Sequence, residues 1–198
     1  MQPSALRQDI SIDRQTGLIT GAFYVPSPNC DDRPLESAID LLVIHNISLP
    51  PGEFGGLHIN ALFTNTLDPT LHPYFAEIAS MRVSSHCLIR RDGTLVQYVP
   101  FHKRAWHAGE SQFMGREDCN DYSIGIELEG TDTEPYTAEQ YRVLSVLILA
   151  LHTVYTDLSP ERMVGHSTIA PLRKTDPGPA FEWATLQGLM KNYSESIG

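Results

Sequence analysis

The sequence predicts an α/β domain built on one sheet that mixes parallel and antiparallel strands. Residues 38–44 form a near-continuous apolar run, which is typical of a strand buried on both faces. Asp92-Gly93 separates two apolar segments and indicates a hairpin, because both positions tolerate a positive φ. Residues 137–155 begin with a capping-box pattern at Thr137 and continue as a long helix. This mixture of strands and helices predicts a central mixed sheet flanked by helices.

The remaining elements follow from local patterns of apolar and turn-forming residues. We expect, in chain order, a strand at residues 18–25, a polar turn at 26–34, hairpin strands at 86–90 and 94–99, a strand at 122–129 and a second helix at 181–191. Apolar residues surround most of the circumference of the 137–155 helix, so this helix should be buried against the sheet. Its narrow polar stripe contains His152, which we interpret as a surface histidine.

The segment from Pro50 to Met81 is long, mixes glycines, prolines and aromatic residues, and starts shortly after His45. Two short helices are expected within it, around residues 56–63 and 73–79. Long insertions in compact domains are commonly lids or binding loops. We therefore expect this loop to contribute to a ligand site.

The strand at residues 122–129 carries two carboxylates on one face. Successive side chains of a strand point to opposite sides, so Glu127 and Glu129 share a face with Gly125, and the apolar residues occupy the other face. A carboxylate beside open space is suited to proton transfer. The alternation alone does not decide which of the two glutamates has that role.

Length, charge and cysteine content limit the class of protein. At 198 residues the chain suits a single domain over residues 1–198, with a core at about 18–190. The formal net charge of −10 argues against nucleic acid and anionic membranes as partners, because both are bound chiefly through basic patches. Residues 1–15 lack the apolar stretch of a signal peptide, so we expect a cytoplasmic protein. We also expect a monomer. Reduced thiols are expected at three widely spaced cysteines, Cys30, Cys87 and Cys119.

Three potential metal ligands come from two distant segments. His166 and Asp176 lie ten residues apart in GHSTIAPLRKTDPGP, and His45 follows the apolar strand at residues 38–44. Structural zinc is usually closed by four protein ligands, whereas catalytic zinc keeps three and leaves one position to water. The set predicts an open zinc site suited to hydrolysis.

Five further segments carry motifs in a fixed order: HNISLPPGEFGG, RVSSHCLIRRDGTLVQYVPF, KRAWHAG, NDYSIGIELEGTD and RKTDPGP. Together they resemble the type 2 N-acetylmuramoyl-L-alanine amidases, and most closely the cytosolic 1,6-anhydro-N-acetylmuramyl-L-alanine amidases of the AmpD type. The resemblance extends over roughly residues 18–190. It implies the fold shared by these amidases and the peptidoglycan-recognition proteins.

The resemblance also implies an activity and a site. These amidases recycle bacterial cell-wall fragments by hydrolysing the amide between the lactyl group of 1,6-anhydro-N-acetylmuramic acid and L-alanine of the stem peptide. The substrate is a small molecule, and one Zn²⁺ is the cofactor. The implied residues are the ligands His45, His166 and Asp176, the catalytic Glu127 and Lys174, and the substrate-binding Asn46 and Trp106. Glu129 then becomes a structural carboxylate, and His86 and His107 become structural or substrate-facing histidines.

An acidic chain that binds an anionic muropeptide needs a local cluster of positive charge. We expect Arg82, Arg173 and Lys174 to supply it, since Arg can bind carboxylates in a bidentate manner. Two positions depart from the family pattern. Leu172 stands where glycine is common, which puts the geometry of Lys174 in question, and Asp118 stands where a basic residue is common.

Two other functions compete with cytosolic hydrolysis. The same fold serves non-enzymatic peptidoglycan-recognition modules, but those typically lack a zinc ligand, and this chain has all three. A broad amidase that acts on intact peptidoglycan outside the cytoplasm would need an export signal, which the sequence does not contain.

Overall fold

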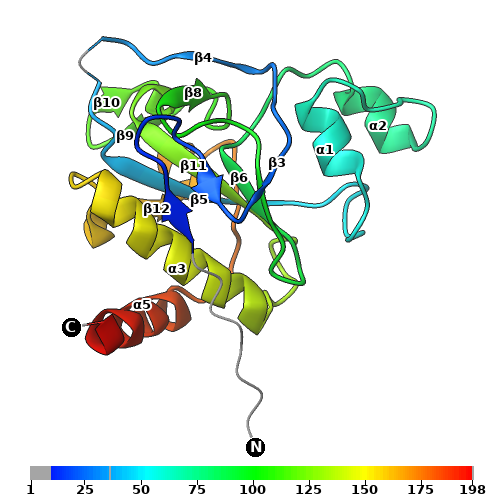
Figure 1. Ribbon diagram of the computed structural model, residues 1–198. Helices are drawn as coiled ribbons and strands as arrows, with labels where there is room; N and C mark the ends of the chain where they lie inside the picture. The colour runs from blue at the N-terminus through cyan, green and yellow to red at the C-terminus, as the bar shows by residue number, and fades with distance from the viewer. Residues whose placement is uncertain (1–9, 36, 198) are drawn as a thin grey trace, which may run out of the picture.

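A six-stranded mixed sheet organises the protein, seen here in a computed structural model that describes residues 10–35 and 37–197 (Figure 1). The strands in spatial order are β12 (Met163–Gly165), β5 (Leu41–Ile47), β11 (Ser123–Glu129), β6 (Cys87–Ile89), β7 (Leu95–Gln97) and β3 (Phe23–Tyr24). Neighbouring strands are parallel except β6 and β7, which form an antiparallel hairpin. The predicted mixed sheet flanked by helices is confirmed.

Three two-stranded sheets and several helices surround the central sheet. The small sheets pair β1 (Ser11–Ile12) with β2 (Ile19–Thr20), β4 (Cys30–Asp32) with β8 (Lys103–Ala105), and β9 (Gln112–Phe113) with β10 (Arg116–Glu117). The α-helices are α1 (His58–Phe63), α2 (Pro73–Ile78), α3 (Ala138–Val154), α4 (His166–Ile169) and α5 (Trp183–Ile197). Two short 3-10 helices complete the fold: η1 (Cys119–Asp121) and η2 (Pro160–Arg162).

Helix α3 covers one face of the sheet, and α5 packs on its outer side (Figure 1). The predicted capping box is present: the Thr137 hydroxyl accepts a hydrogen bond from the backbone of Gln140, and the Gln140 side chain accepts one from Thr137. Gln140 also donates to the carbonyl oxygens of Ile89 and Glu129 at 3.2 and 2.9 Å. One buried side chain therefore starts the helix and ties it to two strands.

The alternation of side chains in β5 and β11 divides the sheet into two different faces. Leu42 and Ile44 of β5 point into the core under α3, whereas Leu41 and Val43 contact the opposite side. By the same period of two, His45 lies on the face away from α3. In β11 the apolar residues likewise enter the α3 core, as predicted. The polar residues of both strands are thereby gathered on one face.

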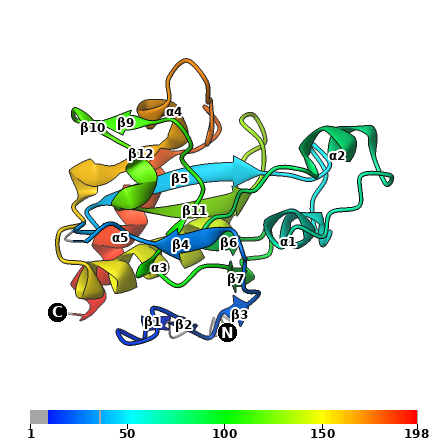
Figure 2. The same ribbon diagram turned by 90° about the horizontal axis from the view of Figure 1, so that it is seen from above.

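Several local predictions are confirmed. The hairpin forms with Gly93 at φ 84°, and α1 and α2 lie within the expected helical segments of the 50–81 loop. Figure 2 shows β5 pointing toward this α1–α2 segment. Helix α3 matches the expected span, and α5 continues past the predicted end at residue 191 to Ile197.

Other predictions were wrong in their boundaries. Residues 18–25 form two strands rather than one, because Gly21 at φ 88° bends the chain, so that β2 pairs with β1 and β3 with β7. The expected turn at 26–34 contains β4, which pairs with the distant β8. The strand predicted at residues 38–44 lies three residues further on, at Leu41–Ile47, since β11 pairs with β5 over this whole length.

The described residues show the state of the cysteines and the character of the helices. Cys30, Cys87 and Cys119 are all free, as expected for thiols that form no disulfide framework. Among the residues that the structure describes, no helix has both the length and the apolar character needed to cross a membrane.

We predict that Gln140→Ala lowers the free energy of unfolding by about 2–3 kcal/mol. The substitution leaves buried carbonyl groups without their donor and removes half of the capping box. Urea unfolding measures the change. Arg142→Ala on the same helix is the control and should change stability by less than about 0.5 kcal/mol. Equal effects of the two substitutions would contradict the role given to Gln140.

Candidate metal and catalytic site

Three adjacent parallel strands deliver the candidate site residues to one level of the sheet. His45 in β5 is the register partner of Glu127 in β11, and both lie on the face away from α3. On the other side of β5, β12 ends at Gly165, so that His166 follows directly at the start of α4. Residues separated by up to 121 positions in sequence are thus brought together by strand register.

The side chains of His45, His166 and Asp176 converge on one point. The two Nδ1 atoms lie 3.0 Å apart, and Asp176 Oδ2 lies 3.0 Å from the first and 3.1 Å from the second. Both histidines are almost fully buried, and the carboxylate is partly buried. Two nitrogens and one oxygen in this arrangement form a group that can hold a metal ion.

Backbone contacts hold the loop that carries Asp176. The Asp176 carbonyl oxygen accepts a hydrogen bond from the Ser167 amide at 3.0 Å, which joins the loop to the first turn of α4. A Cβ atom on Gly165 would lie 2.6 Å from the ring of Pro177, so the glycine permits this close approach. The chain then turns at Gly178, whose φ is 77°. These contacts place the carboxylate against both histidines.

The other ring nitrogens of the two histidines contact the segment after Trp106. His166 Nε2 lies 3.0 Å from the carbonyl oxygen of Ala108, and His45 Nε2 lies 2.9 Å from Nδ1 of His107. A carbonyl oxygen only accepts, so Nε2 of His166 carries the proton and Nδ1 keeps its lone pair. Burial lowers the pKa of His45 to about 4, which makes its imidazole neutral at pH 7. Neutral imidazole is the form that binds metal.

These residues lie at the floor of a pocket of about 500 Å³. The predicted site residues that line it are His45, Asn46, Trp106, Glu127, His166, Lys174 and Asp176. The 50–81 loop forms one wall of the pocket with Pro51, Leu62, Phe63, Tyr74, Ile78 and Met81. The loop therefore borders the pocket as a binding loop would, and its contribution to ligand binding stays a prediction.

The environments of Glu127 and Glu129 separate their roles. Glu129 is buried, accepts hydrogen bonds from the amides of Gly55 and Arg91 at 2.7 and 3.1 Å, and lies 3.5 Å from the Arg90 guanidinium. Glu127 faces the pocket, and its buried Oε2 has no hydrogen-bond partner in the described part of the chain. The alternation in β11 did not decide which glutamate is suited to proton transfer, and the contacts of the two side chains now distinguish them. Glu129 joins the 50–81 loop to the hairpin.

The charge state of Glu127 depends on its neighbours. Burial raises the pKa of this carboxyl well above its usual range, and the negative charge of Asp176 raises it further. The ammonium of Lys174 opposes this shift. A carboxyl group with a strongly shifted pKa and a free oxygen in a pocket is a candidate for acid or base catalysis.

Asn46 and Trp106 occupy the walls beside these groups. Asn46 Nδ2 donates to Asp132 Oδ1 at 2.8 Å, and the Trp106 amide donates to Ser84 Oγ at 3.0 Å. Both side chains line the pocket, which is the position that substrate contacts require. Their assignment to substrate binding stays a prediction.

Arg82 and Arg173 are not among the described residues that line the pocket. The guanidinium of Arg82 donates to the carbonyl oxygens of Ser80 and Met81, at the edge of the pocket wall. Arg173 donates to the carbonyl oxygens of Ala108 and Glu110 at 2.6 and 2.7 Å. Their predicted contacts with substrate therefore depend on movement of these side chains, and stay predictions.

The two departures from the family pattern lie at the surface. Leu172 is fully exposed, and within the described chain the non-glycine residues with positive φ do not include it. The loop that carries Lys174 therefore does not need glycine at this position. Asp118 is exposed and has a φ of 55° at the start of η1.

The remaining histidines and several polar residues have structural contacts. His86 is buried, with Nδ1 accepting from the Gly125 amide at 3.0 Å, and His152 is half-buried on α3. His107 contacts the candidate ligand His45, a role that the WHAG motif alone did not indicate. Asn120 and Ser123 near His107 were also missed: Asn120 lies in the short helix η1, which has no periodic pattern, and the alternation of β11 gives the face of Ser123 but not its partner.

Comparison with known proteins defines the class. The sequence pattern of the N-acetylmuramoyl-L-alanine amidase family matches residues 35–179. This match covers most of the chain and includes every residue discussed above as a possible metal ligand. The chain belongs to the N-acetylmuramoyl-L-alanine amidase family.

Its relatives narrow the class to the AmpD type. The 1,6-anhydro-N-acetylmuramyl-L-alanine amidase AmpD of Escherichia coli K12 is 62% identical over 176 residues, which cover 89% of this chain and 96% of the relative. AmpD of Citrobacter freundii is 62% identical over 174 residues, covering 88% and 92%. A crystal structure of a selenomethionine AmpD derivative superposes with a TM-score of 0.87 at 61% identity and covers 90% of this chain and 98% of that chain.

A more distant relative was solved with a substrate. The N-acetylmuramyl-L-alanine amidase AmiD of E. coli, in complex with anhydro-N-acetylmuramic acid-L-Ala-D-gamma-Glu-L-Lys, has a TM-score of 0.57 at 30% identity. The match covers 79% of this chain and 60% of that chain. The shared fold therefore extends to an amidase outside the AmpD type.

We predict that Glu129→Gln and Glu127→Gln have different effects on stability. At position 129 one oxygen becomes an NH₂ group that faces an amide donor, so the free energy of unfolding should fall by about 1–3 kcal/mol. Glu127→Gln should leave stability unchanged or raise it slightly, because a desolvated carboxyl is replaced by a neutral amide. Urea unfolding of the metal-free variants measures both. A larger loss for Glu127→Gln would reverse our assignment.

Proposed function

We propose that the protein is a zinc-dependent amidase that hydrolyses the bond between the lactyl group of 1,6-anhydro-N-acetylmuramic acid and L-alanine, in the recycling of cell-wall fragments. The observation that carries the proposal is the convergence of two histidine nitrogens and one carboxylate oxygen in a pocket that Glu127 also lines, with Glu127 Oε2 lacking a partner in the described part of the chain. The close similarity to AmpD proteins supports the substrate class. Its location in the cytoplasm stays a prediction from the sequence.

Zinc fits the residues that are present. Two imidazoles and a carboxylate are ligands that catalytic zinc commonly uses. Atoms bound tetrahedrally at about 2.0–2.2 Å from zinc lie about 3.3–3.6 Å apart. The three candidate atoms of His45, His166 and Asp176 lie 3.0–3.1 Å apart and need to separate only slightly. When bound, zinc polarises the scissile carbonyl group and lowers the pKa of water.

Glu127 is the group proposed to move the proton. Glu127 lines the pocket together with the candidate metal-binding residues, where the attacking water and the scissile amide must meet, and its Oε2 has no hydrogen-bond partner among the described residues. A nearby dication favours the carboxylate over the acid, and the carboxylate accepts a proton from the attacking water. The same oxygen then donates the proton to the leaving nitrogen of L-alanine.

Lys174 supplies fixed positive charge for the oxyanion that develops on the former carbonyl oxygen. It lines the pocket, and its ammonium influences both His45 and Glu127 electrostatically. Preorganised positive charge at this point stabilises the transition state without further reorganisation. Asn46 and Trp106 are proposed to contact the sugar and the peptide, and Arg82 and Arg173 the stem-peptide carboxylates.

We predict that the wild-type protein binds one equivalent of zinc and that His166→Ala loses it. Removal of one of three ligands leaves too few for a stable site. Elemental analysis after dialysis gives the stoichiometry, and His152→Ala is the matched control, because His152 lies on α3 away from the pocket. A full equivalent of zinc in His166→Ala would contradict the ligand set.

We predict that the zinc-loaded enzyme releases L-alanine-terminated stem peptide from an anhydromuropeptide and much less product from intact sacculi. Mass spectrometry of the products tests both substrates in one assay. Cleavage of sacculi alone would overturn the proposed substrate. Binding without cleavage of either substrate would instead support the recognition-module alternative.

Mutant kinetics should separate the catalytic residues from the substrate-binding residues. Glu127→Gln should keep zinc and lose at least about 10²-fold in kcat, the usual scale for a positioned acid or base. Lys174→Ala should chiefly lower kcat, whereas Arg82→Ala or Arg173→Ala should chiefly raise KM. Glu129→Gln should affect chemistry much less than Glu127→Gln. Unchanged KM in both arginine variants would eliminate their role in binding.

A further inference from the structure

We propose that His107 is a positioning residue: through a hydrogen-bond chain that ends at η1, it fixes the tautomer and ring orientation of His45 so that Nδ1 offers its lone pair to the metal. The inference rests on the proposed function, because it assigns His45 as a ligand. It concerns residues outside the ligand set and predicts their effect on metal affinity.

The direction of donation along this chain of hydrogen bonds is set at Ser123. Ser123 Oγ lies 2.5 Å from the carbonyl oxygen of Cys119, which only accepts, so the serine hydroxyl donates its proton there. Ser123 Oγ then accepts from Nε2 of His107, at 3.2 Å. With Nε2 protonated, Nδ1 of the neutral His107 imidazole is an acceptor, and it receives the Nε2 proton of His45 at 2.9 Å. Nδ1 of His45 is left without a proton.

A second contact gives His166 the same tautomer. Its Nε2 donates to the carbonyl oxygen of Ala108 at 3.0 Å, so Nδ1 keeps its lone pair. That carbonyl oxygen is itself held by the guanidinium of Arg173 at 2.6 Å. The two contacts that orient the histidine ligands therefore come from the adjacent residues 107 and 108.

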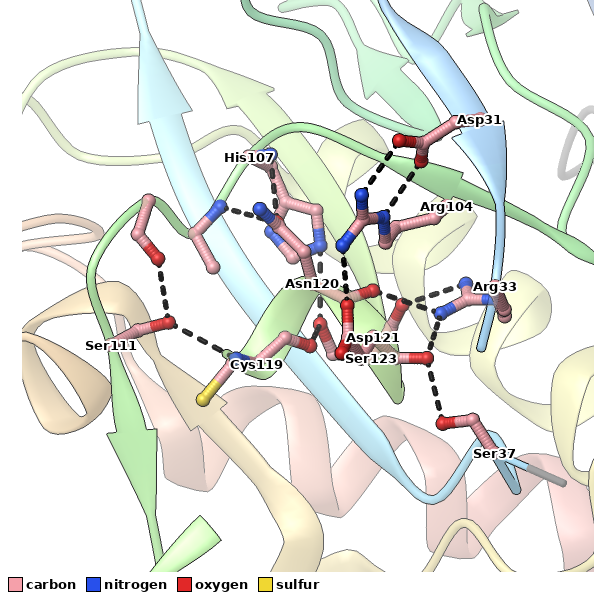
Figure 3. Close-up of polar contacts among 12 residues, drawn as sticks. Asp31, Arg33, Ser37, Arg104, His107, Ser111, Cys119, Asn120, Asp121 and Ser123 are labelled. Carbon is pink, nitrogen blue, oxygen red and sulfur yellow. Dashed lines mark hydrogen bonds and ion pairs between the residues drawn. The ribbon is translucent and has the colours of Figure 1, made fainter. Parts of the chain in front are cut away.

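The turn η1 anchors both of these residues. Asn120 Oδ1 accepts hydrogen bonds from the amides of His107 and Ala108 at 3.0 and 2.8 Å. Figure 3 shows His107, Asn120 and Ser123 close together. Cys119, the preceding residue, supplies the carbonyl oxygen at the end of the His107 chain. The short 3-10 helix η1 thus anchors the two residues that orient His45 and His166.

Gly125 provides the space in which the His107 ring lies. A Cβ atom at this position would lie 2.5 Å from the ring, closer than any side chain tolerates. The glycine lies between Ser123 and Glu127 on the polar face of β11. The His107 ring therefore packs against the strand between its acceptor Ser123 and the pocket.

Partners of this kind raise the basicity of a ligand and hold its ring in place, and their loss typically costs about 10- to 100-fold in metal affinity. We therefore expect His107→Phe, which fills the same space without an acceptor, to raise the zinc Kd by about 10- to 100-fold. His107→Asn should retain most of the affinity, since its amide oxygen can take the place of Nδ1. Ser123→Ala should raise the Kd by a smaller factor, because it removes the proton acceptor of His107.

The experiment is chelator competition for zinc at one neutral pH, together with ¹⁵N NMR of the histidine rings in the zinc-free protein. Ser145→Ala is the matched control: this buried hydroxyl also donates to a backbone carbonyl oxygen, at 2.8 Å, but lies on α3. Wild type, His107→Asn and Ser145→Ala should show His45 with its proton on Nε2. His107→Phe should weaken or lose that preference.

A Kd for His107→Phe within about twofold of wild type, with the His45 tautomer unchanged, would overturn the proposal. Should His107→Phe fail to fold, Ser123→Ala tests the proposal by the zinc Kd and the His45 tautomer. Equal values for Ser123→Ala and Ser145→Ala would count against the chain of hydrogen bonds. Absence of zinc binding by the wild type would refute the proposed function instead, whereas the tautomer in the zinc-free protein still tests the chain of hydrogen bonds.

Discussion

The mutual repulsion of three acceptor atoms is the constraint on which the site depends. Nδ1 of His45, Nδ1 of His166 and Oδ2 of Asp176 lie 3.0–3.1 Å apart, and each presents a lone pair when the outer contacts hold both imidazole protons on Nε2. Only a proton or a cation between them relieves this repulsion. The parallel register of β12, β5 and β11 keeps the three groups together, and the fold thereby favours a bound cation.

The same sheet gives two glutamates opposite tasks. Glu127 and Glu129 share a strand face, yet Glu129 is saturated by backbone amides and holds the 50–81 loop against the hairpin. Glu127 keeps one oxygen unbonded and faces the pocket. A satisfied carboxylate contributes to stability, whereas an unsatisfied and desolvated one is available for proton transfer. Two glutamates on one face of β11 thus differ: Glu129 holds the fold together, and Glu127 lines the pocket.

Elements specified by local patterns were predictable from the sequence, and elements that depend on distant pairing were not. The capping box fixed the start of α3, and the turn at Gly93 fixed the hairpin. Strand β5 was predicted three residues too early, because polar His45 closes the apolar run although β11 continues to pair with the chain as far as Ile47. The small sheet of β4 and β8 joins segments about 70 residues apart and has no local pattern.

The family motifs pointed to the three side chains that converge in the structure, but not to the contacts that orient them. The proposed positioning of His45 by His107 depends on the proximity of His107 to Ser123 and on the space left by Gly125. The most direct test of the account is a crystal structure of the zinc-loaded protein with anomalous data at the zinc edge. The account predicts one peak bonded to Nδ1 of both histidines and to Asp176. Ligation through Nε2 of either histidine, or through Glu127 or a cysteine, would contradict it.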